Sequence, residues 1–337
     1  MVTLDRLPSC LPRCSLSYLR SLGCNICFCV IRIRFLKGAT VTANNSSNQK
    51  NNLWGRASMS NIKKTIVNIP KYIVLIIIAA LCIVPLLWAF AASFSPLDKT
   101  FEYAYPFSWK AFVPVDFTIE AYQNIFARGF GDAILKTAGL GIVTVIIGGF
   151  ICTTAGFAFA KFDFPGKKIL LLVVLITFTI PGDLTVIPRY ILIRNWGWIN
   201  TWQALLVPLL ANSLIIFMSY QFFTGFPQEI IDSARVDGAS WFRIYFLIVL
   251  PISKPLLISL GLILFLSQWD SYFWPLLVAP DQNFRVVQLA LTDSVQEYQT
   301  FWNELLAGSM LAALIPILLL LPFQNYYFNA VVGAVKE

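Results

Sequence analysis

Long apolar stretches alternate with short polar segments through most of the chain. A membrane-spanning helix needs about 20 mostly apolar residues, and six stretches are long enough. The run that starts at Tyr72, Tyr-Ile-Val-Leu-Ile-Ile-Ile-Ala-Ala-Leu, has no polar face, whereas a surface helix of a soluble protein needs one. The pattern therefore predicts an all-α, polytopic membrane protein with six transmembrane helices. The expected spans are 72–92, 134–160, 169–188, 202–223, 256–278 and 305–323.

The composition agrees with this pattern and excludes most enzyme chemistry. Hydrophobic residues make up 58% of the chain and charged residues 12%, against about 25% charged in soluble domains. The absence of histidine excludes Ser-His-Asp catalysis and histidine-ligated zinc. The spans hold no Asp/Glu pair at i, i+3 or i+4. A membrane-embedded enzyme is therefore the weaker alternative, and the sequence predicts no catalytic residue and no metal site in the membrane domain.

The first 58 residues differ from the rest of the chain. They contain eight basic residues against Asp5 and five of the seven cysteines, followed by an Asn/Ser-rich run over 42–52. Three interpretations remain open: a metal site at Cys24-x-x-Cys27-x-Cys29, a basic targeting or anchoring segment, and an extension outside the folded unit. We favour a disordered extension over 1–58 and a membrane domain over 59–337, with Met59 as the working start. Because most of the net positive charge lies in the extension, the sequence predicts no nucleic-acid partner.

The charge of the loops predicts the orientation of the spans. Basic residues concentrate in cytoplasmic loops of membrane proteins. One set of loops holds ten basic groups and the other holds six, so we expect both termini in the cytoplasm and a multi-pass chain in the plasma membrane. The ten are Lys63, Lys64, Lys71, Lys161, Lys167, Lys168, Arg235, Arg243, Lys254 and Lys336.

The cytoplasmic loop between the fourth and fifth spans, residues 226–251, is too polar to lie in lipid. Its pattern predicts two short helices joined by a turn. Asp237-Gly238 ends the first helix, because glycine adopts the left-handed conformation easily. Ser240 is placed to cap the second helix, which Pro251 closes. Apolar residues in both helices leave a surface that needs a partner; the alternative is an amphipathic connector on the membrane surface.

This loop resembles the EAA signature of permease subunits in binding-protein-dependent ABC importers, Glu-Ala-Ala-x-x-Asp-Gly-Ala followed by Leu-Pro. Asp232 stands in place of Glu and Ser233 in place of Ala. The resemblance implies a coupling loop that docks on a separate cytoplasmic ATPase. The residues that match the signature are Asp232, Ser233, Ala234, Asp237, Gly238, Ala239, Leu250 and Pro251.

Further segments are similar to the carbohydrate branch of these importers, the MalG-like permeases. They include Ala155–Lys167, Ile187-Pro-Arg-Tyr190, Trp269-Asp-Ser-Tyr-Phe-Trp-Pro275 and the tail Val332–Lys336. The resemblance implies the type I permease fold and import of a sugar or oligosaccharide; another solute such as a polyol phosphate is the alternative. It also implies a second permease subunit and an extracellular solute-binding protein. The chain has no Gly-x-x-x-x-Gly-Lys-Ser/Thr loop, so it needs no cofactor of its own and the partner ATPase is expected to bind ATP.

Polar residues inside apolar spans are candidates for the transport path, because ionisable groups in lipid are costly. Asp183 and Asp270 have no obvious basic partner in their own spans, and water at the outer interface is the alternative for both. Gln268, Trp269 and Tyr272 surround Asp270 with hydrogen-bonding groups and aromatic faces, which suit a sugar. Asn212 lies in the middle of the fourth span, where it lines the path or bonds to a neighbouring helix. The tentative path residues are Asp183, Asn212, Gln268, Trp269, Asp270 and Tyr272.

Overall fold

The computed structural model describes residues 53–104, 108–295 and 299–333. The chain divides into two units, Met1–Trp88 and Ala89–Glu337, which are considered separately. The described part of the first unit belongs to α1 (Leu53–Ser93), which continues into the second unit. The candidate metal site at Cys24, Cys27 and Cys29 lies outside the described residues, as does the expected extension up to residue 52. Residues 53–58, also assigned to that extension, form the first turns of α1.

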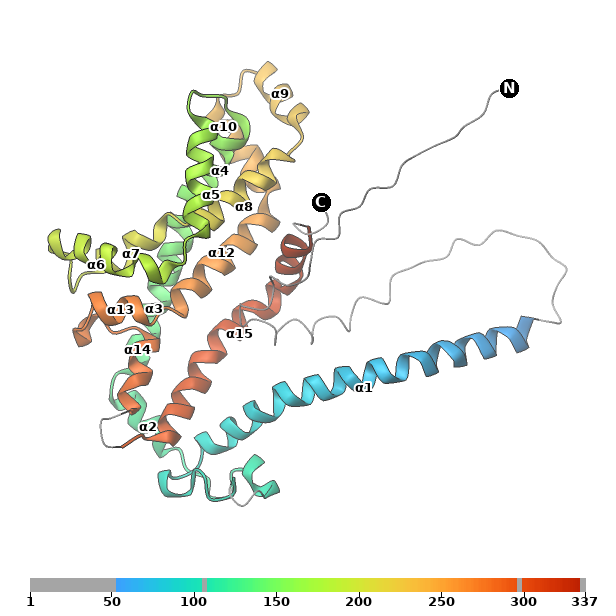
Figure 1. The fold of residues 1–337 in the computed structure, drawn as a ribbon, viewed down its shortest axis with the longest axis vertical. Helices are drawn as coiled ribbons and strands as arrows, with labels where there is room; N and C mark the ends of the chain where they lie inside the picture. Colours follow the sequence, from blue (N-terminus) through green and yellow to red (C-terminus); the bar gives the residue numbers. More distant parts are fainter. Residues whose placement is uncertain (1–52, 105–107, 296–298, 334–337) are drawn as a thin grey trace. The chain divides into compact units, whose positions relative to one another are not determined.

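The second unit is built from helices, apart from one isolated bridge between Val295 and Thr300 among the described residues. Its α-helices are α2 (Glu120–Ala127), α3 (Phe130–Val143), α4 (Gly149–Lys161), α5 (Lys167–Thr179), α6 (Val186–Asn195), α7 (Trp202–Leu210), α8 (Ser213–Thr224), α9 (Gln228–Val236), α10 (Trp241–Ile244), α11 (Leu250–Ile252), α12 (Lys254–Trp269), α13 (Phe273–Val278), α14 (Val287–Leu291) and α15 (Trp302–Gly333). Figure 1 labels all of these α-helices except the short α11. The prediction of an all-α fold is confirmed.

Short 3-10 and π segments join these helices. The 3-10 segments are η2 (Leu97–Lys99), η3 (Trp109–Phe112), η5 (Gly182–Thr185), η7 (Gln282–Phe284) and η8 (Thr292–Ser294). Two π-helices, η4 (Thr144–Gly148) and η6 (Tyr245–Val249), continue the α-helices on both sides without a break. The Asp116 carboxylate accepts a hydrogen bond from the Lys99 ammonium of η2. This contact raises the pKa of Lys99.

Within the described residues, four stretches are long and apolar enough to cross a membrane. They are Pro70–Ser93, Phe130–Lys161, Trp202–Thr224 and Trp302–Gln324. Two further candidates are pairs of helices that meet at a sharp bend: Lys167–Thr179 with Gly182–Asn195 at 102°, and Trp241–Ile252 with Lys254–Trp269 at 82°. Exposed apolar side chains cover these helices; Leu81 of α1 is 70% exposed and Ile169 of α5 is 69% exposed. Such surfaces are suited to lipid or to other membrane subunits.

The third and fifth spans differ from the expected continuous helices. The third was expected over 169–188, but α5 ends at Thr179 because Pro181 favours an extended backbone at Ile180. The fifth was expected to reach 278, but α12 ends at Trp269 and α13 follows as a separate helix. The polar residues between Trp269 and Phe273 explain this break, since they compete with the helix for backbone hydrogen bonds.

The tightest contact between two helices joins α4 and α8. A Cβ atom at Gly156 would lie 2.8 Å from the Tyr220 backbone nitrogen and would overlap the Ser219 side chain. The Ser219 hydroxyl donates to the Ile215 carbonyl oxygen at 2.7 Å and so does not compete for this space. Small residues allow such close backbone approach, which replaces the hydrophobic driving force that is missing in lipid. The two helices therefore form a closely packed pair.

The fourth span is broken between α7 and α8, at Ala211 and Asn212. Cys152 of α4 lies against the break, where its Sγ accepts a hydrogen bond from the Asn212 amide at 3.4 Å and contacts the Leu210 carbonyl oxygen at 3.4 Å. The side-chain oxygen of Asn212 caps α8 by accepting from the Ile215 amide at 3.3 Å. These contacts satisfy backbone groups that no water can reach inside a membrane.

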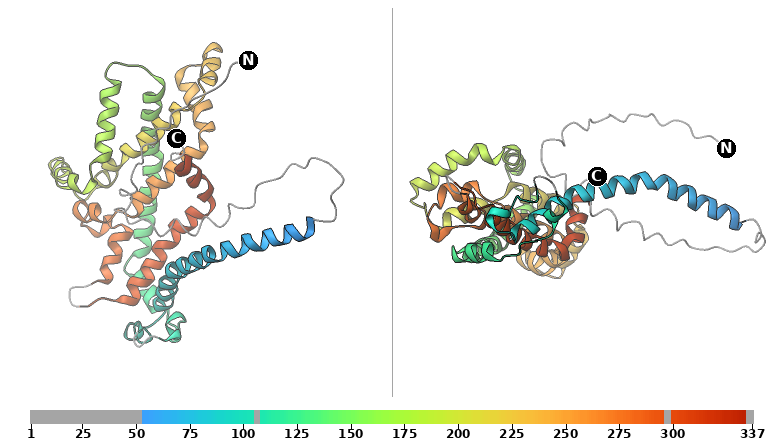
Figure 2. Two further views of the ribbon diagram at one scale, coloured as in Figure 1. Left: turned by 45° about the vertical axis from the view of Figure 1, so that its right-hand side comes forward. Right: turned by 90° about the horizontal axis from the view of Figure 1, so that it is seen from below.

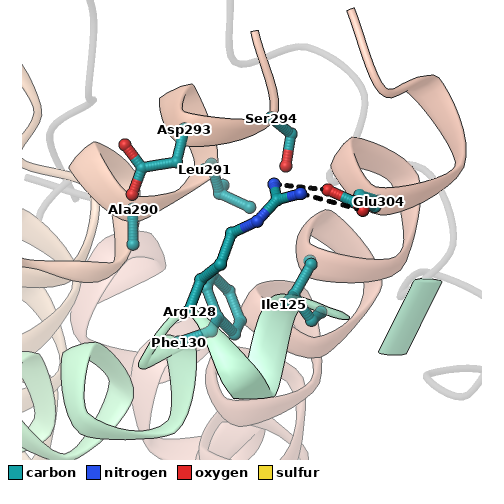
Figure 3. Close-up of a pocket in the computed structure, with 9 residues that line it drawn as sticks. Ile125, Arg128, Phe130, Ala290, Leu291, Asp293, Ser294 and Glu304 are labelled. Atoms are coloured by element: carbon teal, nitrogen blue, oxygen red, sulfur yellow. Dashed lines mark hydrogen bonds and ion pairs between the residues drawn. The ribbon is translucent and has the colours of Figure 1, made fainter. Parts of the chain in front are cut away.

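The end of the second unit opposite α9 is held by an ion pair whose carboxylate is buried (Figures 1 and 3). The Arg128 guanidinium, which follows α2, binds both carboxylate oxygens of Glu304 in α15, at 2.6 and 3.2 Å. The Asn124 side chain donates to the same carboxylate at 3.0 Å. The Glu304 side chain is 3% exposed and that of Arg128 is 39% exposed. Three hydrogen bonds compensate the buried carboxylate, which would otherwise be costly.

The Gly156→Ala variant tests the contact between α4 and α8. Because the added methyl group meets backbone as well as side-chain atoms, we expect a loss of about 1–3 kcal/mol of stability. The Gly139→Ala variant is the matched control: it lies in α3, and no atom lies within 4 Å of its added methyl group. A thermal-stability assay on detergent-purified protein should show a lower midpoint for Gly156→Ala only. Equal midpoints for the two variants would contradict the packing described here.

Candidate functional site

Helices α9 and α10 form the candidate coupling loop, at one end of the second unit (Figures 1 and 2). Gly238 has φ +78° and ends α9. Its amide donates to the Arg235 carbonyl oxygen at 3.1 Å, and the Ala239 amide donates to the Ala234 carbonyl oxygen at 3.0 Å. This pair of bonds is the Schellman motif, which closes a helix end. The Ser240 side chain then caps α10 by accepting from the Arg243 amide at 3.4 Å. The expected helix–turn–helix is present, and only its far end differs.

That difference concerns Pro251, which was expected to close the second helix. It lies inside α11, and the 82° bend follows at Ser253, between α11 and α12. Ser253 is buried. The chain from Trp241 to Ile252 is thus one helical stretch with the π-helix η6 in its middle.

The base of the loop is anchored in a hydrophobic cluster. Ile231 of α9 and Ile244 of α10 are both fully buried, and Ala234 is 7% exposed. They belong to a cluster that includes Phe157 of α4 and Phe223 of α8. Burial of an isoleucine side chain contributes about 1.5–3 kcal/mol. The loop is therefore packed onto the apolar helices α4 and α8.

Polar contacts add to this anchoring. The Lys161 ammonium at the end of α4 donates to the Phe226 carbonyl oxygen at 2.8 Å and to the Gln228 side chain at 3.2 Å. The Gln228 amide also donates to the Asp232 carboxylate at 3.0 Å. Across the turn, the Arg235 guanidinium lies 5.1 Å from the centre of the Trp241 ring, a cation–π distance. Both helices of the loop are thus tied to each other and to α4.

The outer surface of the loop combines apolar and charged groups. Val236 is 88% exposed and Phe242 is 73% exposed. Asp237 and Gly238 lie between them and are also exposed. An exposed apolar patch with a polar border marks an interaction site more often than an isolated exposed residue does. The surface is therefore suited to a protein partner.

The structure places the other signature residues around this surface. Asp232 and Ser233 are exposed on α9, and Ala239 is half-buried beside the turn. Leu250 is half-buried and Pro251 is exposed, at the end of the loop that leads into α12. Ala234 is buried instead. A small residue suits this position, because α9 packs there against the hydrophobic cluster.

The second helix of the loop is also bonded to α4. The Tyr245 hydroxyl lies 2.9 Å from the Thr153 hydroxyl and accepts from the Thr154 hydroxyl at 3.2 Å. Tyr245 itself is 5% exposed. Displacement of the loop must therefore be transmitted to α4 as well as to α12, because the hydrogen bonds and the covalent chain join it to both.

The tentative path residues fall into three places. Asp183 is exposed in η5, at the bend between α5 and α6. Asn212 is half-buried at the break between α7 and α8. Gln268, Trp269, Asp270 and Tyr272 lie around the end of α12.

The group at the end of α12 contains two buried and two exposed side chains. Gln268 is 2% exposed, and its amide atoms have no hydrogen-bond partner in the described residues. Trp269 is 1% exposed, and its indole N–H donates to the Ala312 carbonyl oxygen at 3.1 Å. Asp270 and Tyr272 are exposed. The exposed pair is therefore available to a solute, whereas the indole N–H of Trp269 is occupied.

Sequence reasoning missed two kinds of residue. It counted Lys161 only as a charge that orients the chain, although this residue also anchors the coupling loop. It also missed the pair Arg128–Glu304, whose members are far apart in the chain. Neither pairing has a local sequence signal, because each depends on which helices become neighbours.

Comparison with known proteins identifies the same architecture in membrane transporters. The chain is 29% identical over 267 residues to the arabinooligosaccharides transport system permease protein AraQ of Halalkalibacterium halodurans, covering 77% of this chain and 93% of AraQ. It is 28% identical over 275 residues to the sn-glycerol-3-phosphate transport system permease protein UgpE of Shigella flexneri, covering 79% of this chain and 96% of UgpE.

A solved structure shares the fold. The crystal structure of a bacterial ABC transporter involved in the import of the acidic polysaccharide alginate contains a chain that matches with a TM-score of 0.69 at 20% sequence identity. The match covers 79% of this chain and 98% of the other. The predicted importer permease fold is confirmed. Residues 152–332 match the model of the binding-protein-dependent transport system inner membrane component, and because this segment is more than half of the chain and contains the whole coupling loop, the chain belongs to that family.

Proposed function

We propose that this protein is the membrane subunit of an ATP-driven importer for a sugar or oligosaccharide, and that residues 226–251 couple it to a separate ATPase. The observation that carries the proposal is the rigid loop whose exposed tip joins Val236 and Phe242 to an aspartate–glycine turn. The loop is anchored to α4 and continues into α12. A partner that moves the tip would therefore move membrane helices.

The ATPase belongs to a different chain in this proposal, because the sequence has no phosphate-binding loop of the Gly-x-x-x-x-Gly-Lys-Ser/Thr type. Val236 and Phe242 are exposed apolar residues beside the turn, and the exposed residues Asp237 and Arg243 next to them are charged. Such a mixed surface is typical of protein interfaces, which have an apolar centre and a polar rim. The loop faces the cytoplasm, and both termini lie on that side, as the distribution of basic residues predicts. A second permease subunit and an extracellular solute-binding protein complete the importer.

The substrate class rests on the relatives and on the end of α12. One relative is named for arabinooligosaccharides and another for sn-glycerol 3-phosphate. In this chain, the exposed Asp270 carboxylate and Tyr272 ring offer a hydrogen-bond acceptor and an aromatic face, which suit sugar hydroxyls and C–H faces better than a phosphate. A negatively charged phosphate would be repelled by Asp270. We therefore favour an oligosaccharide over a polyol phosphate.

Removal of the apolar tip should weaken ATPase binding. We expect the double variant Val236→Ser/Phe242→Ser to lose about 2–4 kcal/mol of affinity, because exposed anchors of this kind supply most of the energy of an interface. The matched control is Val113→Ser, which changes a 60% exposed valine outside the loop. The measurement is co-purification of the cognate ATPase from membranes that hold equal amounts of each variant. An ATPase retained equally by the double variant and the control would refute the proposed docking surface.

Gly238 tests whether the turn must keep its left-handed backbone. The Gly238→Ala variant should reduce ATP-driven uptake several-fold, because a side chain at positive φ costs about 1–2 kcal/mol. Gly238→Asn should lose less, since asparagine tolerates this conformation better than other residues. No atom lies within 4 Å of a Cβ at Gly238, so crowding does not explain a difference. Equal uptake by wild type, Gly238→Ala and Gly238→Asn would show that the turn geometry is not needed.

Asp270 tests the proposed path. The Asp270→Asn variant should raise the concentration of arabinotriose needed for half-maximal uptake about tenfold or more, because a hydrogen bond to a charged group contributes roughly 1.5–3 kcal/mol. Ser267→Ala is the control: its side chain is exposed on the same helix, and its hydroxyl donates to the Ile263 carbonyl oxygen. Uptake of sn-glycerol 3-phosphate by the same vesicles decides between the two substrate classes. If wild-type vesicles import the phosphate and not the sugar, the substrate assignment is wrong.

A further inference from the structure

Several prolines lie inside the described helices and remove helical hydrogen bonds, among them Pro208 and Pro316. Pro208 lies in α7 and Pro316 lies in α15. Proline has no N–H, so the carbonyl oxygen four residues earlier receives no helical hydrogen bond. The carbonyl oxygens concerned belong to Ala204 and Ala312. In a membrane, no water is available to satisfy them.

Two tryptophans bind these two carbonyl oxygens. The Trp274 indole N–H donates to the Ala204 oxygen at 2.9 Å, and the Trp269 indole N–H donates to the Ala312 oxygen at 3.1 Å. Both side chains are buried, with 6% and 1% exposed. Each indole therefore replaces the N–H that a proline lacks.

Both tryptophans lie in one short segment at the end of α12. Trp269 is the last residue of α12, and Trp274 is the second residue of α13. The Trp269 ring stacks on Phe265 of α12 with 5.7 Å between ring centres. The Arg189 guanidinium of α6 lies 5.3 Å from the centre of the Trp274 ring. This segment thus connects α12 to the proline-containing helices α7 and α15 and to α6.

The other end of α12 joins the coupling loop across the bend at Ser253. The body of α12 is mostly buried, and it packs against α3 and α15; its buried residues include Leu260, Leu264 and Phe265. A helix with this much packed surface moves as a rigid element. Displacement of its loop end must therefore reach Trp269.

We propose that Trp269 and Trp274 are positioning residues that fix the proline bends of α7 and α15 to the end of α12, so that all three move together when the coupling loop is displaced. The proposal rests on the proposed function, since it needs a partner that drives the loop. Trp269 acts in it through backbone bonding and not through contact with a solute.

The variants Trp269→Phe and Trp274→Phe test this proposal, because they keep an aromatic ring and remove the N–H. The protein is studied as the complete importer in lipid vesicles, with its ATPase, second permease and solute-binding protein. We expect uptake of arabinotriose per ATP hydrolysed to fall about fivefold or more, the lower end of the usual range for coupling between sites. ATP hydrolysis should continue.

Spin labels give a readout that does not depend on the substrate. The label positions are exposed: Ser267 on α12, Val207 on α7 and Leu314 on α15. In the wild type, we expect the distances 267–207 and 267–314 to stay the same without nucleotide and with ATP and vanadate. Trp274→Phe should change or broaden only the 267–207 distance, and Trp269→Phe only the 267–314 distance. A wild-type distance that changes with nucleotide, or variant distances that match the wild type, would overturn the proposal.

Restoring the missing backbone N–H separates a positioning role from a merely stabilising one. Pro208→Ala supplies an amide for the Ala204 oxygen, so Trp274→Phe/Pro208→Ala should regain the thermal midpoint that Trp274→Phe loses. Its uptake per ATP should stay low, because the link to α12 is still absent. Trp269→Phe/Pro316→Ala should behave in the same way. The mismatched double variants, Trp274→Phe/Pro316→Ala and Trp269→Phe/Pro208→Ala, should regain neither the thermal midpoint nor the uptake per ATP. Recovery of uptake per ATP in the matched pairs would show that the tryptophans only stabilise the helices.

The same experiments separate failure of this inference from failure of the proposed function. If wild-type vesicles import neither sugar nor phosphate when ATP is supplied, the proposed function is wrong and the inference falls with it. If the wild type works and the variants equal it, only the inference is wrong. If a single variant does not assemble, its matched proline double variant restores the backbone bond and is measured in its place.

Discussion

Every backbone polar group in a membrane must find its partner inside the protein, and this requirement shapes most of what is unusual in the fold. The described spans are not uniform cylinders: they contain prolines, two π-helices and a break between α7 and α8. At several of these irregularities, a side chain from a distant helix reaches the exposed backbone group. Cys152 does so at Asn212, and two indoles do so at Ala204 and Ala312. Each irregular helix in lipid thus relies on a neighbouring helix for a hydrogen-bond partner, so these helices stabilise one another.

The coupling loop follows the opposite rule. Its tip carries exposed charged residues, and its stability comes from the packed base beneath them. Ile231 and Ile244 are buried, while Val236 and Phe242 remain exposed across the same turn. The Schellman bonds at Gly238 hold these two pairs in a fixed relation. A surface of this kind can transmit force, because the exposed groups cannot move without moving the buried ones.

The sequence predicted the fold class, the family resemblance and the helix–turn–helix of the coupling loop, because each depends on local patterns. Hydrophobic runs give the spans, and Asp237-Gly238 and Ser240 give the turn and the cap. It did not predict the end of α12 at Trp269. The expected span was set by the number of apolar residues, and that number does not reflect the low helix preference of Asp270 and Ser271. It also could not pair Trp274 with Ala204 or Arg128 with Glu304. Those contacts depend on tertiary packing, which leaves no local periodicity.

The ion pair between Arg128 and Glu304 has a mechanical consequence for α15. It fixes the first turn of that helix to the end of α2, whereas further along the helix is bonded to Trp269 of α12 through the Ala312 carbonyl oxygen. A rod held at one tip can only pivot about it, so the arc travelled grows with distance from the fixed tip. In any such pivot, the half of α15 beyond Pro316 would travel furthest. Separation of α15 from α2 at Glu304 would first require two opposite charges to part, one of them a carboxylate whose side chain is 3% exposed.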